Sequence, residues 1–120
     1  MGVRGYRDLK VWKLGIEIAD FTYRITEFFP RREEYGLASH MRRTAVSIPS
    51  NIAEGHSRQH TREYRQHCFI SLGSCAELET QLVIAERRGL VPEAASSDLA
   101  EQLDHESRML RNLTRNLGGT

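Results

Sequence analysis

Cysteine, proline and long apolar runs are all scarce in this chain of 120 residues, and each scarcity excludes something. With only three prolines, long helices are allowed. Cys68 and Cys75 stand seven residues apart in one expected helix, roughly 10 Å at 1.5 Å per residue, which is too far for a disulfide. We therefore expect free, buried thiols in a reducing compartment, which favours a cytoplasmic protein. The short apolar runs and the charged N-terminus predict neither a membrane span nor a secretory signal.

Global charge is also weak, because the formal net charge is only +1. Its distribution along the chain is uneven. Residues 40–67 hold five arginines against two glutamates and include four of the five histidines, whereas residues 77–106 hold eight acids against two arginines. Such a chain can pair its two halves within or between subunits, or offer one basic face to a polyanion.

Apolar residues recur at three- and four-residue steps in four segments, about 8–28, 36–54, 61–88 and 97–117. Asp8 is a suitable N-cap for the first segment, and Pro30 should stop it. Gly55 and Gly89 should end the second and third segments. Nothing is typical of a strand, so we predict one all-α domain over residues 1–120, an antiparallel up-down-up-down four-helix bundle.

The predicted buried positions follow from the same spacing. In the first helix they are Leu9, Trp12, Ile16, Ala19 and Tyr23. The third helix has a heptad line of Tyr64, Cys68, Ser71, Cys75, Leu78, Leu82 and Ala85, with a second apolar line of Phe69, Leu72, Ala76 and Val83 beside it. In the fourth helix Glu106 interrupts a line of leucines, as a residue at the seam edge or as a buried polar group that needs a partner.

Pro49 lies inside the second helix, where proline removes a hydrogen bond and crowds the preceding turn. The apolar spacing continues through it, from Leu37 and Met41 before the proline to Ile52 after it. We therefore expect a helix kinked at Pro49 rather than a loop.

Residue patterns for catalysis or metal binding are lacking. A di-iron bundle needs Glu-x-x-His repeats, and no such repeat occurs in the chain. The nearest ligand-like set is His56, His60, Glu63 and His67, which is read more simply as the solvated start of a helix. No Gly-rich phosphate loop is present, and the cysteines lie on a core face where thiols are inert. We expect no enzymatic activity, no cofactor, no metal and no small-molecule substrate.

Five arginines near the connection between the second and third helices are the candidate binding residues: Arg42, Arg43, Arg58, Arg62 and Arg65. Their guanidinium groups suit phosphate oxygens, so RNA or DNA is one expected partner. The alternative is that they pair with the acids of residues 77–106, within one chain or between chains.

Two blocks resemble a known family. They are the stretch "RRTAVSIPSNIAEG" from Arg42 to Gly55 and the stretch "GSCAELETQL" from Gly73 to Leu82. With "YRDLKVWKLGIEIA" and the leucine-rich last helix, the chain resembles the 23S rRNA intervening-sequence proteins, once labelled S23 ribosomal protein, over about residues 6–117. The motif residues carried over are Arg42, Arg43, Ser47, Ile48, Pro49, Asn51, Ile52, Glu54 and Gly55, and then Gly73, Glu77 and Glu79.

The resemblance implies an all-α bundle that assembles into a ring, a homopentamer. It also implies kinship with the accessory variability protein of diversity-generating retroelements, a nucleic-acid-binding bundle, and it implies no enzyme. We therefore expect a non-catalytic cytoplasmic bundle, without membrane association, that forms a cyclic homo-oligomer and binds nucleic acid through arginines. The alternative is a structural or protein-interaction scaffold whose charges close subunit contacts, with no nucleic-acid binding.

Overall fold

The computed structural model describes residues 5–118, and no strand occurs within that range. Its elements are η1 (Tyr6–Asp8), α1 (Lys10–Thr26), η2 (Arg31–Glu33), α2 (Leu37–His56), α3 (Thr61–Arg87) and α4 (Glu93–Leu117). The four expected helices are all present. Asp8 belongs to the 3-10 turn before α1, so the N-cap position of α1 is Leu9 and not Asp8. The last helix begins four residues earlier than expected, directly after Pro92.

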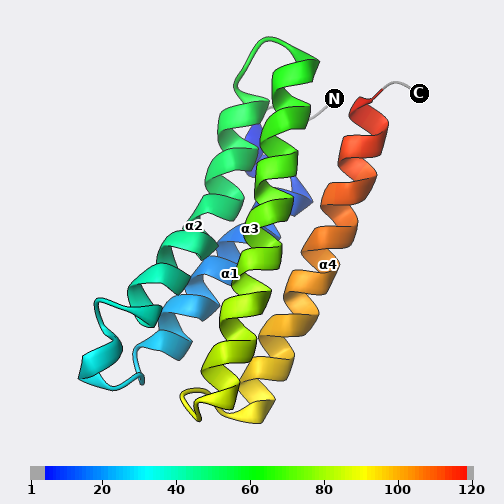
Figure 1. The fold of residues 1–120 in the computed structure, drawn as a ribbon. Helices are drawn as coiled ribbons and strands as arrows, with labels where there is room; N and C mark the ends of the chain where they lie inside the picture. The colour runs from blue at the N-terminus through cyan, green and yellow to red at the C-terminus, as the bar shows by residue number, and fades with distance from the viewer. Residues whose placement is uncertain (1–4, 119–120) are drawn as a thin grey trace.

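Four long helices form an antiparallel bundle that measures 45 × 23 × 22 Å (Figure 1). Each helix packs on its neighbour in the sequence, and α4 closes the bundle by packing on α1 as well as α3. As a result the α2–α3 connection, the start of α1 and the end of α4 lie at one end of the bundle (Figure 1). This up-down-up-down arrangement is the predicted fold.

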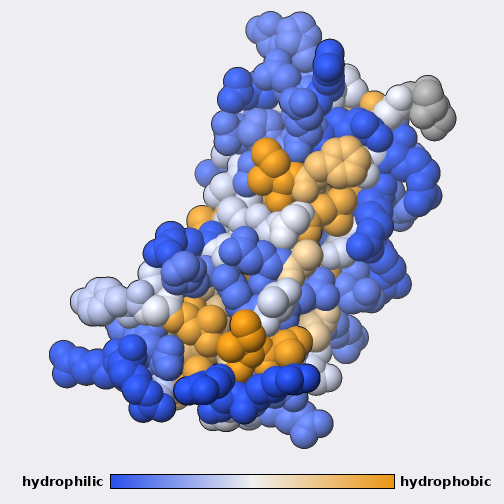
Figure 2. Space-filling model, viewed as in Figure 1, coloured by the Kyte–Doolittle hydropathy of each residue, from blue (hydrophilic) through white to orange (hydrophobic). Residues whose placement is uncertain are grey.

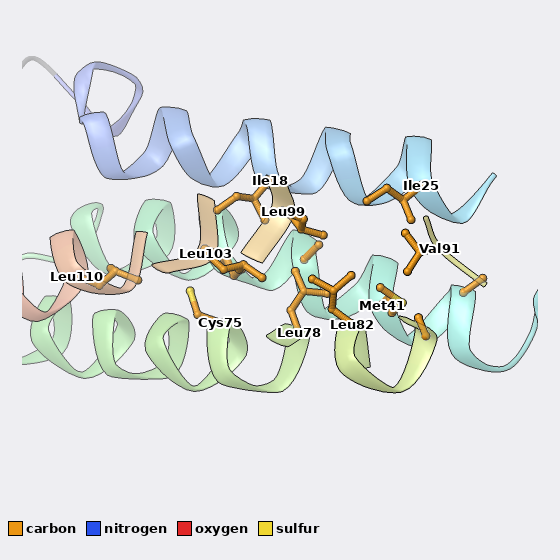
Figure 3. Close-up of a cluster of buried hydrophobic side chains, with 14 of the residues drawn as sticks. Ile18, Ile25, Met41, Cys75, Leu78, Leu82, Val91, Leu99, Leu103 and Leu110 are labelled. Carbon is orange, nitrogen blue, oxygen red and sulfur yellow. The ribbon is translucent and has the colours of Figure 1, made fainter. Parts of the chain in front are cut away.

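The core runs along the whole bundle and takes apolar side chains from every helix (Figure 3). Ile18, Met41, Leu78, Leu103 and Leu110 are among its fully buried members. The heptad positions of α3 are buried from Cys68 to Ala85, as expected. The second apolar line of α3 is largely exposed, contrary to expectation, and includes Phe69 at 46% and Val83 at 51%.

The buried face of α1 differs from the predicted one. Val11, Gly15, Ile18, Thr22 and Ile25 form its buried stripe, and Thr26 is buried beside it. These positions also follow steps of three and four, but the stripe includes a glycine and a threonine that a pattern of apolar residues does not detect. The predicted stripe lies beside it, and its members Ile16 and Tyr23 are 41% and 45% exposed. α1 therefore carries a second apolar stripe that the bundle leaves partly uncovered.

α2 is continuous through Pro49, which is buried together with Ile48 and Ile52. This confirms the prediction that the chain around Pro49 is helical rather than a loop. The kink at Pro49 stays a prediction from the chemistry of proline. Gly55 does not end the helix, since α2 continues to His56. By contrast, Gly89 has a φ of 71° and follows the end of α3, where a left-handed residue is expected.

Among the described helices, α3 is long and apolar enough to cross a membrane, judged by length and composition alone. One of its faces is buried in the bundle, including Cys68, Cys75, Leu78 and Leu82. The core helix of a bundle meets the same criteria, so the position of α3 in the fold accounts for its composition. The uninterrupted apolar runs of the sequence are short and did not predict such a helix.

Candidate nucleic-acid interface

The structure divides the five predicted arginines between the two ends of α2. Arg42 and Arg43 lie in its first two turns, whereas Arg58 lies two residues after its end. Arg62 is the second residue of α3, and Arg65 lies about one turn further on. The helix from Arg43 to its end at His56 is roughly 20 Å long at 1.5 Å per residue, and Arg58 lies beyond that end. The expected grouping around the α2–α3 connection therefore holds for three arginines and is wrong for Arg42 and Arg43.

Arg42 is a structural residue at the opposite end of the bundle. Its Nη1 lies 2.8 Å from Glu34 Oε1, and its Nε donates a hydrogen bond of 2.8 Å to Thr26 Oγ1. The guanidinium carbon also lies 5.4 Å from the centre of the Tyr23 ring. Only 19% of the Arg42 side chain is exposed, so this residue fastens the end of α1 and the α1–α2 connection to α2. The neighbouring Arg43 stays exposed.

Arg58 and Arg62 stand at the α2–α3 connection with different surroundings. Arg58 contacts two carboxylates, Glu54 at 3.0 Å and Glu63 at 3.5 Å, and keeps 47% of its side chain exposed. Arg62 is exposed, and none of the ion pairs found within residues 5–118 includes it. The carboxylates that meet the predicted arginines come from residues 34, 54 and 63, so pairing with residues 77–106 does not occur within the described chain.

Arg65 joins the start of α3 to the end of α4. Its Nε donates a hydrogen bond of 2.9 Å to the carbonyl oxygen of Thr114. A cation at the C-terminus of a helix satisfies late carbonyl groups and favours the helix dipole. The same guanidinium lies over the exposed ring of Phe69, with its carbon 4.9 Å from the ring centre. Arg65 therefore has a structural role. It holds the end of α4 against the start of α3, a contact that the sequence did not predict.

Motif residues around Pro49 form a polar seam between α2 and α3. Ser47 Oγ lies 2.6 Å from Ser74 Oγ across the seam. Ser71 Oγ donates a hydrogen bond of 2.8 Å to the Ile48 carbonyl oxygen, directly before the proline. These bonds anchor the turn that contains Pro49 to the neighbouring helix, so this part of the motif serves packing.

A second group of motif residues meets His67. Asn51 Nδ2 donates to the Ser47 carbonyl oxygen at 2.9 Å, and Asn51 Oδ1 lies 3.0 Å from His67 Nδ1. Because Oδ1 can only accept, the proton of that ring nitrogen points at Asn51. His67 Nε2 lies 4.0 Å from Glu54 Oε2. A Cβ atom at Gly55 would come within 2.6 Å of His67 Cβ, so this glycine permits the close approach of α3.

The remaining motif residues are on the exposed side of α3. Gly73 has open space around its Cβ position, and Glu77 and Glu79 are exposed. Neither glutamate is in any of the ion pairs found within residues 5–118. Their carboxylates are therefore free to meet another molecule.

Groups for metal or nucleophilic chemistry do not converge in the described part of the chain. No cluster of three or more His, Cys, Asp or Glu side chains is placed to hold a metal ion there. His56 instead packs its ring against Tyr64, with 5.4 Å between the ring centres. Burial raises the pKa of Cys68 to about 11 and that of Cys75 to about 12, so both thiols are protonated at neutral pH.

A hollow of about 540 Å³ lies between α1 and α4 and is bordered by Phe21, Asp98, His105 and Arg108 among others. Phe21 and Arg24 also border a second, more apolar hollow of about 250 Å³ near Phe28. None of the residues predicted from the sequence as binding or motif residues borders either of them.

Two arginines of this region were missed in the sequence. Arg111 and Arg115 are exposed on α4 on either side of Thr114, the residue that Arg65 contacts. The sequence does contain a signal for a second basic region, because residues 107–118 hold three arginines and no acid. Only the folded bundle shows that these residues lie beside the start of α3, since about fifty residues separate them in the chain.

The fold and these residues define a four-helix bundle whose second helix carries a proline-containing motif packed on the third. Comparison with known proteins is consistent with this class. The family model for the 23S rRNA-intervening sequence protein matches residues 7–112, so the chain belongs to this family. No curated protein matches the chain.

Among solved structures, the chain is similar to a protein of unknown function from the S23 ribosomal protein family of Bacteroides thetaiotaomicron. The TM-score is 0.81 with 18% sequence identity, and the match covers 87% of this chain and 97% of the other. At that identity the likeness concerns the fold alone, and it agrees with the four-helix bundle described above.

Proposed function

We propose that this protein is a non-catalytic, cytoplasmic bundle that binds nucleic acid through arginines at the α2–α3 end and assembles into a cyclic homo-oligomer. The observation that carries the proposal is the position of Arg62, an exposed cation with no carboxylate partner in the described chain, between Arg58 and Arg65. All three guanidinium groups lie at one end of the bundle. Planar guanidinium groups bind phosphate oxygens in pairs of hydrogen bonds, so a phosphate backbone fits this end.

Salt dependence tests this proposal directly. Binding to labelled RNA and DNA oligonucleotides should weaken steeply between about 50 and 200 mM salt, because phosphate contacts release counterions. The double variant Arg58→Ala/Arg62→Ala should bind about tenfold more weakly or worse. The matched control is Arg31→Ala/Arg32→Ala, which removes two exposed arginines at the other end of the bundle. The proposal is wrong if the wild-type protein binds neither polymer at low salt.

The second candidate is a scaffold whose charges and apolar surface close subunit contacts, without nucleic-acid binding. The observation that favours assembly is an uncovered apolar stripe, formed by the exposed Ile16 and Tyr23 of α1 and the exposed Val46 of α2. A shallow hollow of about 240 Å³ between the two helices includes Ile16, Val46 and Pro49. The free carboxylates of Glu77 and Glu79 would supply the charged part of such a contact.

Assembly itself is common to both candidates, so nucleic-acid binding distinguishes them. A ring of five subunits is the size that the family resemblance implies. A ring needs two unlike surfaces that meet head to tail, because one self-complementary surface gives only a closed pair. The α1/α2 stripe and the exposed Val83 and Ile84, toward the other end of α3, are two such unlike surfaces.

A further inference from the structure

Contacts between the first turns of α3 and the last turns of α4 build a face that the sequence interpretation did not include. The hydrogen bond from Arg65 to the Thr114 carbonyl oxygen fixes the two helices side by side. Gly118 approaches the same guanidinium, since a Cβ atom at this glycine would lie 3.3 Å from Arg65 Nε. Arg111 and Arg115 precede and follow Thr114 on α4 and are exposed.

This face is positively charged with little internal compensation. Its arginines are Arg62, Arg65, Arg111 and Arg115, and none of them is in any of the ion pairs found within residues 5–118. The nearby Asp104 is already paired with Arg108, at 3.2 Å on the same helix. Clustered cations without carboxylate partners raise the local positive potential and attract a polyanion.

Phe69 adds an aromatic surface to the same face. It follows Arg65 by one turn of α3, remains 46% exposed, and its ring is contacted by the Arg65 guanidinium. The bundle core does not use this ring, and the next residue, Ile70, is 52% exposed. Figure 2 shows apolar patches over α3 with hydrophilic atoms beside them over α4. An exposed aromatic ring among arginines is the combination on which unpaired bases stack.

We propose that the α3/α4 face binds single-stranded nucleic acid, with Arg62, Arg65, Arg111 and Arg115 on the phosphates and one base stacked on Phe69. This inference rests on the proposed function and narrows it to one strand and one face. A duplex keeps its bases stacked on each other and offers only phosphates, so it would use the arginines but not the ring. Oligouridine and oligothymidine share the required chemistry, and both serve as probes.

The first test removes the two arginines of α4. In fluorescence anisotropy, Arg111→Ala/Arg115→Ala should weaken binding of labelled oligouridine and oligothymidine about tenfold or more and reduce the slope of log K against log salt by about 1.4. The matched control Arg87→Ala/Arg88→Ala removes two exposed arginines from the far end of α3. This control should bind like the wild type.

The second test separates stacking from charge. Phe69→Leu keeps an apolar side chain and removes the ring, so single-strand affinity should fall about fivefold or more while duplex affinity stays unchanged. Circular dichroism and sedimentation of each variant show whether fold and assembly are retained. Equal losses for single strand and duplex, or a change of oligomeric state in Phe69→Leu, would assign the ring to packing and overturn the stacking contact.

The outcomes also distinguish this inference from the broader proposal. Suppose that Arg58→Ala/Arg62→Ala loses binding and Arg111→Ala/Arg115→Ala does not. Nucleic acid then binds at the α2–α3 connection, and the assignment of the binding site to the α3/α4 face is wrong. If the wild-type protein binds no probe, the proposed function itself fails. A change of oligomeric state in Arg111→Ala/Arg115→Ala would make these arginines subunit contacts and would likewise overturn the inference.

Discussion

Glu106 places a carboxyl group inside the apolar core of the bundle. The residue is fully buried, and neither carboxyl oxygen has a hydrogen-bond partner within residues 5–118. Its Oε2 lies 3.1 Å from the position that a Cβ atom would take at Gly15, so the glycine leaves room for it between α1 and α4. Burial without a partner disfavours the charged form and raises the pKa of Glu106 to about 8. At neutral pH the group is therefore mostly neutral.

This raised pKa predicts a pH dependence of stability. The unfolded chain titrates Glu106 near 4.5, so stability is complete below that pH, declines as the pH rises and levels off above about 8. The decline contributed by one such group is at most about 1.4 kcal/mol per pH unit. Urea unfolding at several pH values should show a steeper decline for the wild type than for Glu106→Gln. Parallel curves for the two proteins would mean that Glu106 is ionised or solvated in the fold.

At the scale of elements, two motif glycines, Gly55 of α2 and Gly73 of α3, differ in their surroundings. Gly55 is buried where α3 approaches α2 closely. A Cβ atom added at Gly55 would lie only 2.6 Å from His67 Cβ and 3.2 Å from an atom of Tyr64. Gly73 is exposed in the middle of α3 and has open space around its Cβ position. Both belong to motif blocks, but only Gly55 is required by packing.

Alanine at these two positions should therefore change stability in opposite directions. Gly55→Ala forces α2 and α3 apart and should destabilise the fold by about 1–3 kcal/mol, the usual cost of overpacking. Gly73→Ala meets no neighbour and should stabilise the fold by up to about 1 kcal/mol, because alanine favours helix more than glycine does. Thermal unfolding measures both. A stabilised Gly55→Ala would show that the seam relaxes without cost.

Helix number, order and approximate bounds could be predicted because spacing and helix-breaking residues act locally. The buried face of α1 could not, since two apolar stripes lie side by side and the choice between them depends on Gly15 and Thr22 fitting against other helices. The arginines Arg58 and Arg62 are close in the sequence, so their position at one end of the bundle could be predicted. Arg111 and Arg115 join them only through the tertiary contact between α3 and α4, which the sequence does not indicate. Arg42 was predicted to bind a partner because its ion pair with Glu34 forms only when the α1–α2 connection folds back on α2, which the sequence does not indicate.

At the scale of the whole molecule, the arginines of the α3/α4 face and the apolar α1/α2 stripe occupy different parts of the bundle. The arginines of the α3/α4 face are at one end, whereas the uncovered stripe of Ile16, Tyr23 and Val46 lies along α1 and α2. Assembly through the stripe would leave the arginines of each copy accessible. A ring would then present several identical cationic sites to one strand.

This separation predicts that assembly and binding can be uncoupled. Val46 is 41% exposed, and Val46→Lys would place an unpaired charge in the proposed contact, which is strongly unfavourable once buried. Sedimentation velocity should show a shift toward the monomer. The control is Tyr35→Lys at an isolated position that is 94% exposed, and its mass should not change.

The same variant then reports on binding. A short oligonucleotide that spans one site should bind Val46→Lys and the wild type equally, because the arginines are untouched. A long strand that engages several subunits should bind the variant far more weakly, because linked sites raise affinity by two to four orders of magnitude, roughly 10²–10⁴-fold. Equal affinity for long strands despite a monomeric variant would mean that each subunit binds alone, and an unchanged mass would remove the α1/α2 stripe from the assembly.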